Sequence, residues 1–408
     1  MSEVREADAA REIGLHQAAI DAARLREILP PELIPIFGAR FIRSHHLYDE
    51  FVYRLVLQVV HDVGLEAILQ EPGDAAELAD RAKLEPRRAV VPLDWMLRLL
   101  ASRGALDEHR GGGASRFRVR APFPSLDPVA VKDEQLRHDA SGLPSYTLAE
   151  TVAREYPAFL RGERSGEEVL FTPRHIRLWI DYFSNDNGLY VVNNRVGAVA
   201  LEQWLPRDGG TILELGGGLG SGALAVLERL ESMGRLGAVN EYRFTEFVPA
   251  FLRRGQQALQ ARYPAPSCLT FGAVDMNRPF ADQGVAPSSL SVVYAVNTLH
   301  VAHDLELTLG EVRRALEPGG RLIVSECVRP RPGQPIYAEF VFNLTETFRS
   351  PRLHPLYRPG GGFLTPEQWR AAIEAAGFAD VHFLPDIVRV REHVTDFFAA
   401  AIGSIQPD

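Results

Sequence analysis

The chain has 408 residues, of which 46% are hydrophobic, and it carries a formal net charge of −9. This length and apolar content permit a large buried core and predict two domains. The acidic balance disfavours a nucleic-acid backbone as the main partner, because such a partner usually demands a basic surface. We therefore expect no nucleic-acid partner.

The cysteine content and the N-terminus predict a cytoplasmic protein. Cys268 and Cys327 lie far apart in the sequence and suggest neither a disulfide framework nor a metal knuckle. The first residues are polar and acidic, and no window reaches the roughly 18 apolar residues of a membrane span. We expect neither a secretion signal nor a membrane partner.

Residues 1–170 predict a mostly helical N-terminal domain. Residues 73–109 read as a short helix, a turn and a longer helix, and residues 111–119 read as a hairpin, which is the element order of a winged helix. The longer helix places leucine and methionine at core spacing and offers few basic residues. A dimerisation or lid role is therefore favoured over DNA binding, and we expect a homodimer.

Residues 171–205 are expected to link the domains through lid helices. This segment is dense in aromatic residues, among them Trp179, Tyr182, Phe183 and Tyr190. Such residues either cover a pocket or pack in a core, and the sequence leaves both interpretations open.

Strands and helices alternate in residues 206–408, which predicts a doubly wound, Rossmann-like α/β domain. The candidate strands are 211–215, 242–247, 269–275, 290–296 and 321–326. Thr365 is predicted to cap a later helix that ends at Gly377 and precedes a further strand.

The stretch TILELGGGLGSG, residues 211–222, predicts a strand, a tight turn and the start of a helix. Glycines in such a turn let a ligand approach the backbone. The Gly-Lys-Ser/Thr of a phosphate loop is absent. Glu214, two residues before Gly216, would repel a pyrophosphate but suits a ligand with an ammonium group or another cationic centre.

Acidic residues also follow the next two predicted strands. Glu246 can accept hydrogen bonds from both hydroxyls of a ribose. Asp275 can accept one from an adenine amino group, while Met276 packs on the ring. Three acids at three strand ends therefore predict a cationic adenosine ligand.

The chain resembles the class I S-adenosylmethionine-dependent methyltransferases over roughly residues 205–390. The resemblance rests on LELGGGLG, FTEF, AVDM and RRALEPGGRLIVSE. It implies that S-adenosylmethionine is bound and that S-adenosylhomocysteine is the product. The cofactor-binding residues it implies are Glu214, Gly216, Gly217, Gly218, Gly220, Glu246, Phe247, Asp275, Met276 and Asn297.

A histidine and an acid follow the fourth and fifth predicted strands, beside the expected position of the methyl group. His300 can remove a proton from the acceptor, while Glu326 fixes its tautomer and stabilises the imidazolium. His303 could replace His300 as the base or join it on a metal. We predict no metal site, although a divalent metal remains an alternative.

Residues 275–326 resemble more specifically the C-methyltransferase domains of polyketide synthases, whose proposed catalytic His and Glu match His300 and Glu326. The chain also resembles winged-helix small-molecule O-methyltransferases and the metal-dependent methyltransferase domains of some polyketide loading modules. We expect a free-standing enzyme that methylates carbon or oxygen of a polyketide-like natural product. The acceptor is a small molecule or is bound to a carrier protein.

Two other functions stay open. One is a methyltransferase-fold cyclase or rearrangement catalyst that keeps the cofactor without transferring its methyl group. The other is a winged-helix regulator that senses a ligand, for which DNA binding with a steep salt dependence would be diagnostic.

The insertion after the fifth predicted strand is expected to wall the acceptor pocket. Phe340, Phe342 and Phe348 are candidates for its lining, with core packing as the alternative. His354, Arg349, Arg352 and Arg358 could bind an anionic acceptor or form a solvated surface.

Overall fold

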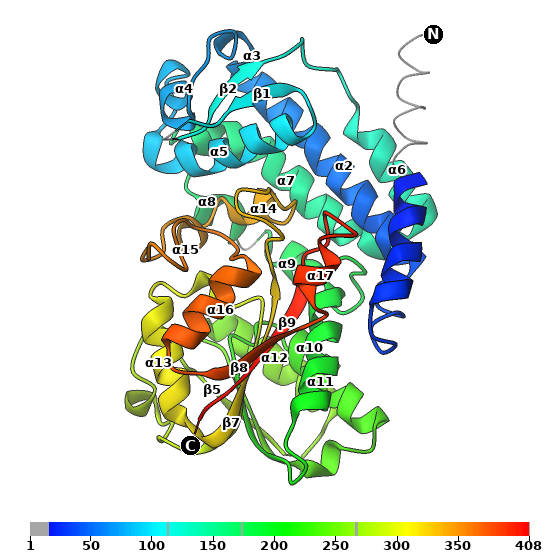
Figure 1. Cartoon of the computed structure of the whole chain (residues 1–408), viewed down its shortest axis with the longest axis vertical. Coiled ribbons are helices and arrows are strands. Elements are labelled where there is room, and N and C mark those ends of the chain that lie inside the picture. The colour runs from blue at the N-terminus through cyan, green and yellow to red at the C-terminus, as the bar shows by residue number, and fades with distance from the viewer. Residues whose placement is uncertain (1–15, 112–113, 173, 266–267, 408) are drawn as a thin grey trace. The chain divides into compact units, whose positions relative to one another are not determined.

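The computed structural model describes residues 16–111, 114–172, 174–265 and 268–407. Their contacts divide the chain into two compact units, drawn in Figure 1. Unit 1 takes its residues from Met1–Ala23, Gly38–Tyr182 and Arg331–Arg349, and unit 2 takes the remaining residues. The functional division into 1–170, 171–205 and 206–408 stays a prediction.

Unit 1 is built from helices that pack in pairs. The long helix α2 packs against α6 and α7, and α5 packs against α4 and α7. The helices of this unit are α2 (Ala39–Asp62), α3 (Leu65–Ile68), α4 (Ala75–Arg81), α5 (Pro86–Ser102), α6 (Pro128–His138), α7 (Leu143–Leu160), α8 (Gly166–Leu170), α9 (Ile176–Tyr182), α14 (Glu339–Phe342) and α15 (Glu346–Arg349).

The predicted order of helix, turn, helix and hairpin is present in unit 1. Asp74 caps α4 in a capping box with Glu77, and Pro86 stands in the first turn of α5. The strands β1 (Leu106–His109) and β2 (Arg116–Val119) pair antiparallel. The apolar residues expected in the core of α5 are buried, namely Leu93, Met96, Leu97, Leu99 and Leu100. A winged-helix role for these elements stays a prediction.

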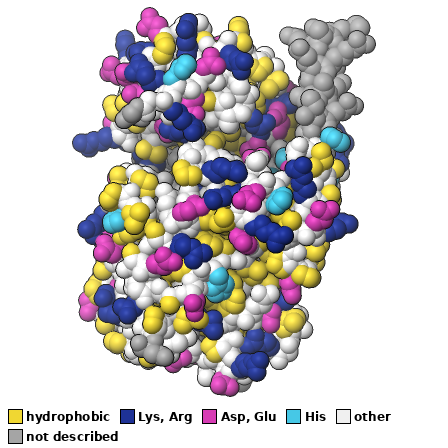
Figure 2. Space-filling view, in the orientation of Figure 1, with side chains coloured by type: hydrophobic (Ala, Val, Ile, Leu, Met, Phe, Trp, Pro, Cys, Tyr) yellow, Lys and Arg dark blue, Asp and Glu magenta, His cyan; other side chains and the backbone are white. Residues whose placement is uncertain are grey.

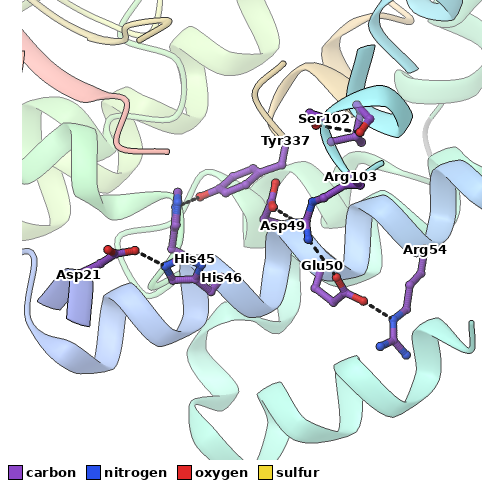
Figure 3. Close-up of polar contacts among 10 residues, drawn as sticks. Asp21, His45, His46, Asp49, Glu50, Arg54, Ser102, Arg103 and Tyr337 are labelled. Carbon is purple, nitrogen blue, oxygen red and sulfur yellow. Dashed lines mark hydrogen bonds and ion pairs between the residues drawn. The ribbon is translucent and has the colours of Figure 1, made fainter. Parts of the chain in front are cut away.

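The chain returns to unit 1 through residues 331–349, between two stretches that belong to unit 2. Figure 3 shows Tyr337 of this segment against α2, where its hydroxyl lies 3.2 Å from Nδ1 of His45. Both side chains are buried. The adjacent His46 pairs through Nε2 with Asp21 at 3.0 Å. One polar contact and the packing of the Tyr337 ring against that of Tyr48 therefore hold this distant segment on α2.

Two of the predicted pocket phenylalanines serve the core of unit 1. Phe340 is fully buried, and its ring centroid lies 5.0 Å from that of Tyr156 and 6.0 Å from that of Trp95. Phe348 is also buried and lies 6.1 Å from Phe342. Both rings thus pack within unit 1, and a contribution to an acceptor pocket stays a prediction.

Unit 2 contains a seven-stranded sheet in the order β5-β4-β3-β6-β7-β9-β8. Only β9 runs antiparallel to its neighbours. The strands are β3 (Gly210–Leu215), β4 (Val239–Thr245), β5 (Leu269–Gly272), β6 (Leu290–Val296), β7 (Leu316–Cys327), β8 (Ala379–Leu384) and β9 (Ala399–Ile405). The five strands predicted from Gly210 onward are all present.

Helices cover both faces of this sheet, as the doubly wound prediction requires. Figure 1 shows α10 and α11 on one face and α13 and α16 on the other. α10 packs on β6, β7 and β9, while α13 packs on β7 and α16 on β8. The helices of unit 2 are α10 (Val191–Trp204), α11 (Ser221–Ser232), α12 (Pro249–Arg262), α13 (Leu305–Ala315), α16 (Pro366–Ala375) and α17 (Ile387–Val390).

The last strand, β9, was not predicted from the sequence. Its residues AAAIGSI include three alanines and a glycine, which are weak strand formers. A Cβ atom at Gly403 would come within 2.7 Å of the Trp204 ring. Packing against Trp204 therefore requires a small residue at position 403. The contacts of the folded chain, and not the low strand propensity of these residues, thus determine that β9 is a strand.

Charged side chains of both signs are interspersed on the face drawn in Figure 2. Many charged side chains of the described residues form ion pairs, for example Arg262 with Glu231 and Arg391 with Glu367. Within the described ranges, no helix is long and apolar enough to cross a membrane.

Candidate active site

The predicted site residues lie at the carboxyl ends of five neighbouring strands of unit 2. Glu214 lies near the end of β3, Glu246 directly follows β4, and Asp275 follows β5. Asn297 directly follows β6, and Glu326 lies at the end of β7. Because parallel strands end at one edge of a sheet, these side chains share one edge, where ligands of doubly wound folds bind.

The glycines of residues 216–220, here called the glycine loop, serve different purposes. A Cβ atom at Gly216 would lie 2.4 Å from Thr298, and one at Gly217 would lie 2.2 Å from the ring of Phe244. Gly218 has a φ of +57° and no atom within 4 Å of its Cβ position. Gly216 and Gly217 are thus required because Thr298 and Phe244 pack directly against them. The backbone of Gly218, in contrast, is open to a ligand.

Glu214 carries an unsatisfied buried oxygen. Its side chain is 1% exposed, and within the described part of the chain its Oε2 has no hydrogen-bond partner. Burial raises its pKa to about 8; Glu246 adds to this rise, and the nearby Tyr242 hydroxyl opposes it without reaching hydrogen-bond geometry. A buried acceptor without a donor is costly, so this position fits the ammonium group of a ligand.

Glu246 faces the glycine loop. Its Oε2 accepts a hydrogen bond from the N–H of Gly218 at 2.9 Å, and its Oε1 accepts one from the N–H of Val248 at 2.7 Å. Burial raises its pKa. Each carboxylate oxygen has a second lone pair, so the geometry still allows both to accept from ribose hydroxyls.

The other predicted cofactor residues lie around these two acids. Gly220, with a φ of +89°, is the N-cap of α11. Phe247 is 60% exposed, and Asp275 and Met276 are half-buried. Asp275 Oδ1 accepts a hydrogen bond from the backbone N–H of Asn277 at 2.9 Å. Their roles toward the cofactor stay predictions.

His300 and Glu326 form a buried pair. Nδ1 of His300 lies 2.7 Å from Oε2 of Glu326, and both side chains are buried. Oε1 of Glu326 accepts from the N–H of Thr298 at 3.1 Å and from that of His300 at 3.3 Å. The carboxylate thus fixes the imidazole with Nδ1 protonated, which leaves Nε2 as the basic nitrogen of the neutral ring.

Residues 298–302, here called the His300 turn, are also held by Arg358. This arginine is 1% exposed and donates to the carbonyl oxygens of His300 and Ala302. Burial lowers its pKa to about 10, and the charges of Glu326 and Asp304 oppose that shift. The solvated-surface interpretation of Arg358 is therefore wrong, since the side chain is sealed beneath the turn.

Asn297 has a φ of +49° and uses its side chain within the protein. Its Oδ1 accepts from Nδ2 of Asn193 at 2.8 Å and from the N–H of Cys327 at 3.2 Å. Asn193 lies on α10, in the segment predicted to be a linker. The predicted cofactor contact of Asn297 stays a prediction, and the contacts present shape the start of the His300 turn.

His303 stands apart from the buried pair. Its side chain is exposed, its N–H donates to Oδ1 of Asn277 at 2.7 Å, and its carbonyl oxygen accepts from the N–H of Arg352 at 2.7 Å. The structure therefore brings His300 and Glu326 together and leaves His303 outside. Across the described residues, no group of three or more His, Cys, Asp and Glu is placed to hold a metal.

Sequence reasoning missed two residues that shape the site, Thr298 and Asn193, and it gave Arg358 a different role. Thr298 lies between Asn297 and His300, two residues that were predicted from the sequence, so its position shortly after a strand was a usable signal. Asn193 and Arg358 come from a helix and a loop far along the chain. Nothing in the local pattern of those segments indicates that they reach β6.

Residues 213–322 match the model of a protein family described as a methyltransferase domain. This range contains the glycine loop, Glu246 and His300. Together with the strand order and the acids at the strand ends, it marks this part of the chain as a methyltransferase domain that resembles the class I S-adenosylmethionine-dependent methyltransferases. More particularly, the chain resembles the C-methyltransferase domains of polyketide synthases.

The sequence relatives are polyketide synthases. The chain is 29% identical over 264 residues to highly reducing polyketide synthase 2 of Gibberella zeae, which covers 62% of this chain and 10% of the synthase. It is 26% identical over 260 residues to the polyketide synthase PksM of Bacillus subtilis, covering 62% of this chain and 6% of that protein. The chain thus spans a tenth or less of the length of these relatives.

Solved structures resemble nearly the whole chain. The CurJ carbon methyltransferase matches with a TM-score of 0.74 and 22% identity, over 95% of this chain and 98% of its own. The CMeT domain of the citrinin polyketide synthase matches with a TM-score of 0.68 and 17% identity, over 97% and 98%. At these identities the likeness establishes the fold, including that of the helical N-terminal region.

Proposed function

We propose that this chain transfers a methyl group from S-adenosylmethionine to an acidic carbon of a polyketide-type acceptor, with His300 as the base. The observation that carries the proposal is the buried His300–Glu326 pair, with Nδ1 and Oε2 2.7 Å apart, at the same sheet edge as the glycine loop. Methyl transfer needs positioning, exclusion of water and a deprotonated acceptor, and this edge offers all three.

The cofactor residues fit the chemical groups of S-adenosylmethionine. When bound, this molecule supplies an electrophilic methyl group on a sulfonium centre. Glu214 would face its ammonium group, since Oε2 of that carboxyl is buried and has no partner in the described part of the chain. Gly218 would allow the loop backbone to approach it, and Glu246 would bind the ribose hydroxyls.

In the proposed reaction, Nε2 of His300 accepts the proton of the acceptor carbon. Glu326 stabilises the imidazolium that results, because a carboxylate beside it favours the charged form. The electron pair left on the acceptor carbon forms the new bond to the methyl group, with departure of S-adenosylhomocysteine. A carbon between two carbonyls, as in a β-ketoacyl thioester, has a proton that a histidine can remove.

Carbon is favoured over oxygen as the acceptor atom by the extent of the structural likeness. The structures that cover 95% and 97% of this chain are described as a carbon methyltransferase and a CMeT domain, and the sequence relatives are polyketide synthases. The same base could deprotonate a phenol. Oxygen methylation is therefore retained as a distinct outcome of the experiment.

The decisive experiment incubates the purified chain and S-adenosylmethionine with a β-ketoacyl thioester or with a phenol, and follows S-adenosylhomocysteine and the methylated product by mass spectrometry. We expect methylation of the thioester carbon. Product from the phenol alone would change the acceptor atom, and a rearranged product without S-adenosylhomocysteine would indicate a cyclase. Failure of both acceptors, free and carrier-bound, would contradict the proposal.

The pair itself is tested by His300→Ala, with His303→Ala as the matched control. We expect the first variant to lose turnover and to keep its affinity for S-adenosylhomocysteine. The control should keep its activity, because its side chain is exposed and outside the pair. Equal loss of cofactor affinity in His300→Ala would make the role of that residue structural.

The same proposal includes an acceptor that is bound to a carrier protein, a homodimer of this chain, and a methyl transfer that needs no metal. A carrier-bound thioester should show a higher kcat/KM than the free thioester. Sedimentation should show two copies of the chain, and a chelator should leave turnover unchanged.

A further inference from the structure

Three buried oxygens that have no hydrogen-bond partner among the described residues lie on one face of the sheet in unit 2. They are Oε2 of Glu214 and the hydroxyl oxygens of Tyr242 and Tyr294. Glu214 on β3 stands directly opposite Tyr294 on β6. Ile212, two residues before Glu214, stands opposite Tyr242 on β4. Because side chains two residues apart on a strand share a face, the carboxyl group and both phenols point to the same side of the sheet.

The carboxyl group of Glu214 is enclosed, and no positive charge faces it from the elements packed around it. A Cβ atom at Gly222 of α11 would lie 2.9 Å from Oε1 of Glu214, so this helix closes over the carboxyl group. The titratable groups that face it are Tyr242 from β4, Tyr294 from β6, Tyr190 from the start of α10 and Glu246 after β4. None of these groups is a cation.

These surroundings favour the neutral form of the carboxyl group. A buried carboxylate without a hydrogen-bond donor or a cation is costly. Burial raises the pKa of Tyr242 and Tyr294, so both phenols stay neutral. Burial, and to a smaller extent the charge of Glu246, raise the pKa of Glu214 to about 8. At neutral pH and without a ligand, Glu214 therefore holds a proton.

We propose that Glu214 exchanges this proton for the ammonium group of S-adenosylmethionine, so that cofactor binding releases a proton to the solvent. This inference rests on the proposed function, in which Glu214 faces that ammonium group. The ammonium group offers the positive charge and the N–H donors that an ionised Glu214 lacks, and it keeps its own three hydrogens. A ligand without an ammonium group meets the neutral carboxyl group and displaces no proton from it.

The test measures proton release by calorimetry at neutral pH, in buffers of different ionisation enthalpy. The ligands are S-adenosylhomocysteine and its deaminated analogue, in which hydrogen replaces the α-amino group. We expect S-adenosylhomocysteine to release about one proton more than the analogue. Both ligands carry the ribose, so any proton released from Glu246 is common to the two. The ratio of their affinities should rise by up to about tenfold per pH unit below pH 8.

Substitutions identify the group that loses the proton. Glu214→Gln should abolish the difference in proton release between the two ligands, because glutamine does not titrate. Tyr242→Phe should extend the release to higher pH, because the Tyr242 hydroxyl opposes the rise in the pKa of Glu214. The control Glu241→Gln, from the other end of β4, should keep the wild-type difference.

Equal proton release by the two ligands in the wild type would overturn the inference, even for a protein that methylates its acceptor. If the analogue binds too weakly to measure, an unchanged release by S-adenosylhomocysteine in Glu214→Gln would overturn it instead. If Glu214→Gln does not fold, the two ligands decide in the wild type. Absence of S-adenosylhomocysteine binding would contradict the proposed function together with the inference.

Discussion

The hydroxyl of Thr298 lies 3.2 Å from the carbonyl oxygen of Gly216 and 2.9 Å from that of Val296, and it shares its one hydrogen between them, which joins the His300 turn to the glycine loop. The N–H of the same threonine donates to Oε1 of Glu326 at 3.1 Å. One residue therefore connects the predicted cofactor loop to the predicted catalytic acid. We therefore expect a substitution in the glycine loop to alter the position of the His300 turn as well.

Gly216→Ala tests this connection. Its φ of +63° disfavours any side chain, and the added methyl group would lie 2.4 Å from Thr298. We expect a loss of about 1–3 kcal/mol in unfolding free energy, together with weaker binding of S-adenosylhomocysteine and lower kcat. Denaturant unfolding and calorimetry measure these effects.

Gly237→Ala is the matched control for that substitution. Gly237 lies in the same unit, has no left-handed φ and has no atom within 4 Å of its Cβ position. It should bind S-adenosylhomocysteine as the wild type does. Wild-type stability and binding in Gly216→Ala would show that the loop tolerates a side chain over Thr298.

The sequence predicted the sheet of unit 2 well because its strands are locally encoded. Residues 290–296 are buried throughout, and their continuous apolar pattern marks a strand covered on both faces. β9 was not predicted because its residues are weak strand formers, and the glycine among them, Gly403, is required by Trp204, which lies far away in the sequence. The His300–Glu326 pair was predictable because His300 shortly follows one strand and Glu326 lies at the end of the next. Arg358 was not, since only the folded chain shows that its loop passes beneath His300.

The stability of the cofactor-free protein should fall as pH rises through the titration of Glu214. Its pKa is raised from 4.5 to about 8 in the folded state, so the folded state holds the proton more tightly than the unfolded state. The stabilisation is complete below pH 4.5 and is lost as pH rises toward 8. The slope is up to about 1.4 kcal/mol per pH unit from this group.

Glu214→Gln isolates this contribution, because glutamine does not titrate. Unfolding free energies at a series of pH values should decline less steeply in this variant than in the wild type. Glu246, whose pKa burial also raises, contributes with the same sign and remains in both proteins. The control Glu317→Gln alters an exposed carboxylate of the same unit. Equal slopes in wild type and Glu214→Gln would show that Glu214 is ionised in the folded protein.

Glu246→Gln should weaken S-adenosylhomocysteine binding about tenfold or more, because a charged acceptor of two ribose hydroxyls becomes a neutral one. The carboxylate also binds the N–H groups of Gly218 and Val248, so the glycine loop loses part of its support. Isothermal calorimetry reads the affinity. Glu241→Gln, on the same strand but away from its carboxyl end, should bind normally. Unchanged affinity in Glu246→Gln would remove Glu246 from the cofactor site.

Tyr337→Phe should destabilise unit 1 by about 0.5–1.5 kcal/mol, the net worth of one hydrogen bond. The lost contact is that between the hydroxyl and Nδ1 of His45, at 3.2 Å, where both side chains are buried. A double-mutant cycle with His45→Ala measures their coupling. Additive effects would show that the Tyr337 hydroxyl and His45 do not stabilise each other.

Glu326→Gln separates the two proposed roles of Glu326, which are to hold the His300 turn by hydrogen bonds and to stabilise the imidazolium of His300 by its charge. Glutamine can still accept from the N–H groups of Thr298 and His300, so the turn should keep its shape. It cannot stabilise an imidazolium as a carboxylate does, and kcat should fall by roughly 10²–10⁴. Affinity for S-adenosylhomocysteine should stay within a few-fold of wild type, because no charge is lost from the glycine loop. A variant that turns over normally would mean that His300 works without an ionised partner. One that loses turnover and cofactor affinity together would instead show that Glu326 holds the whole sheet edge in shape.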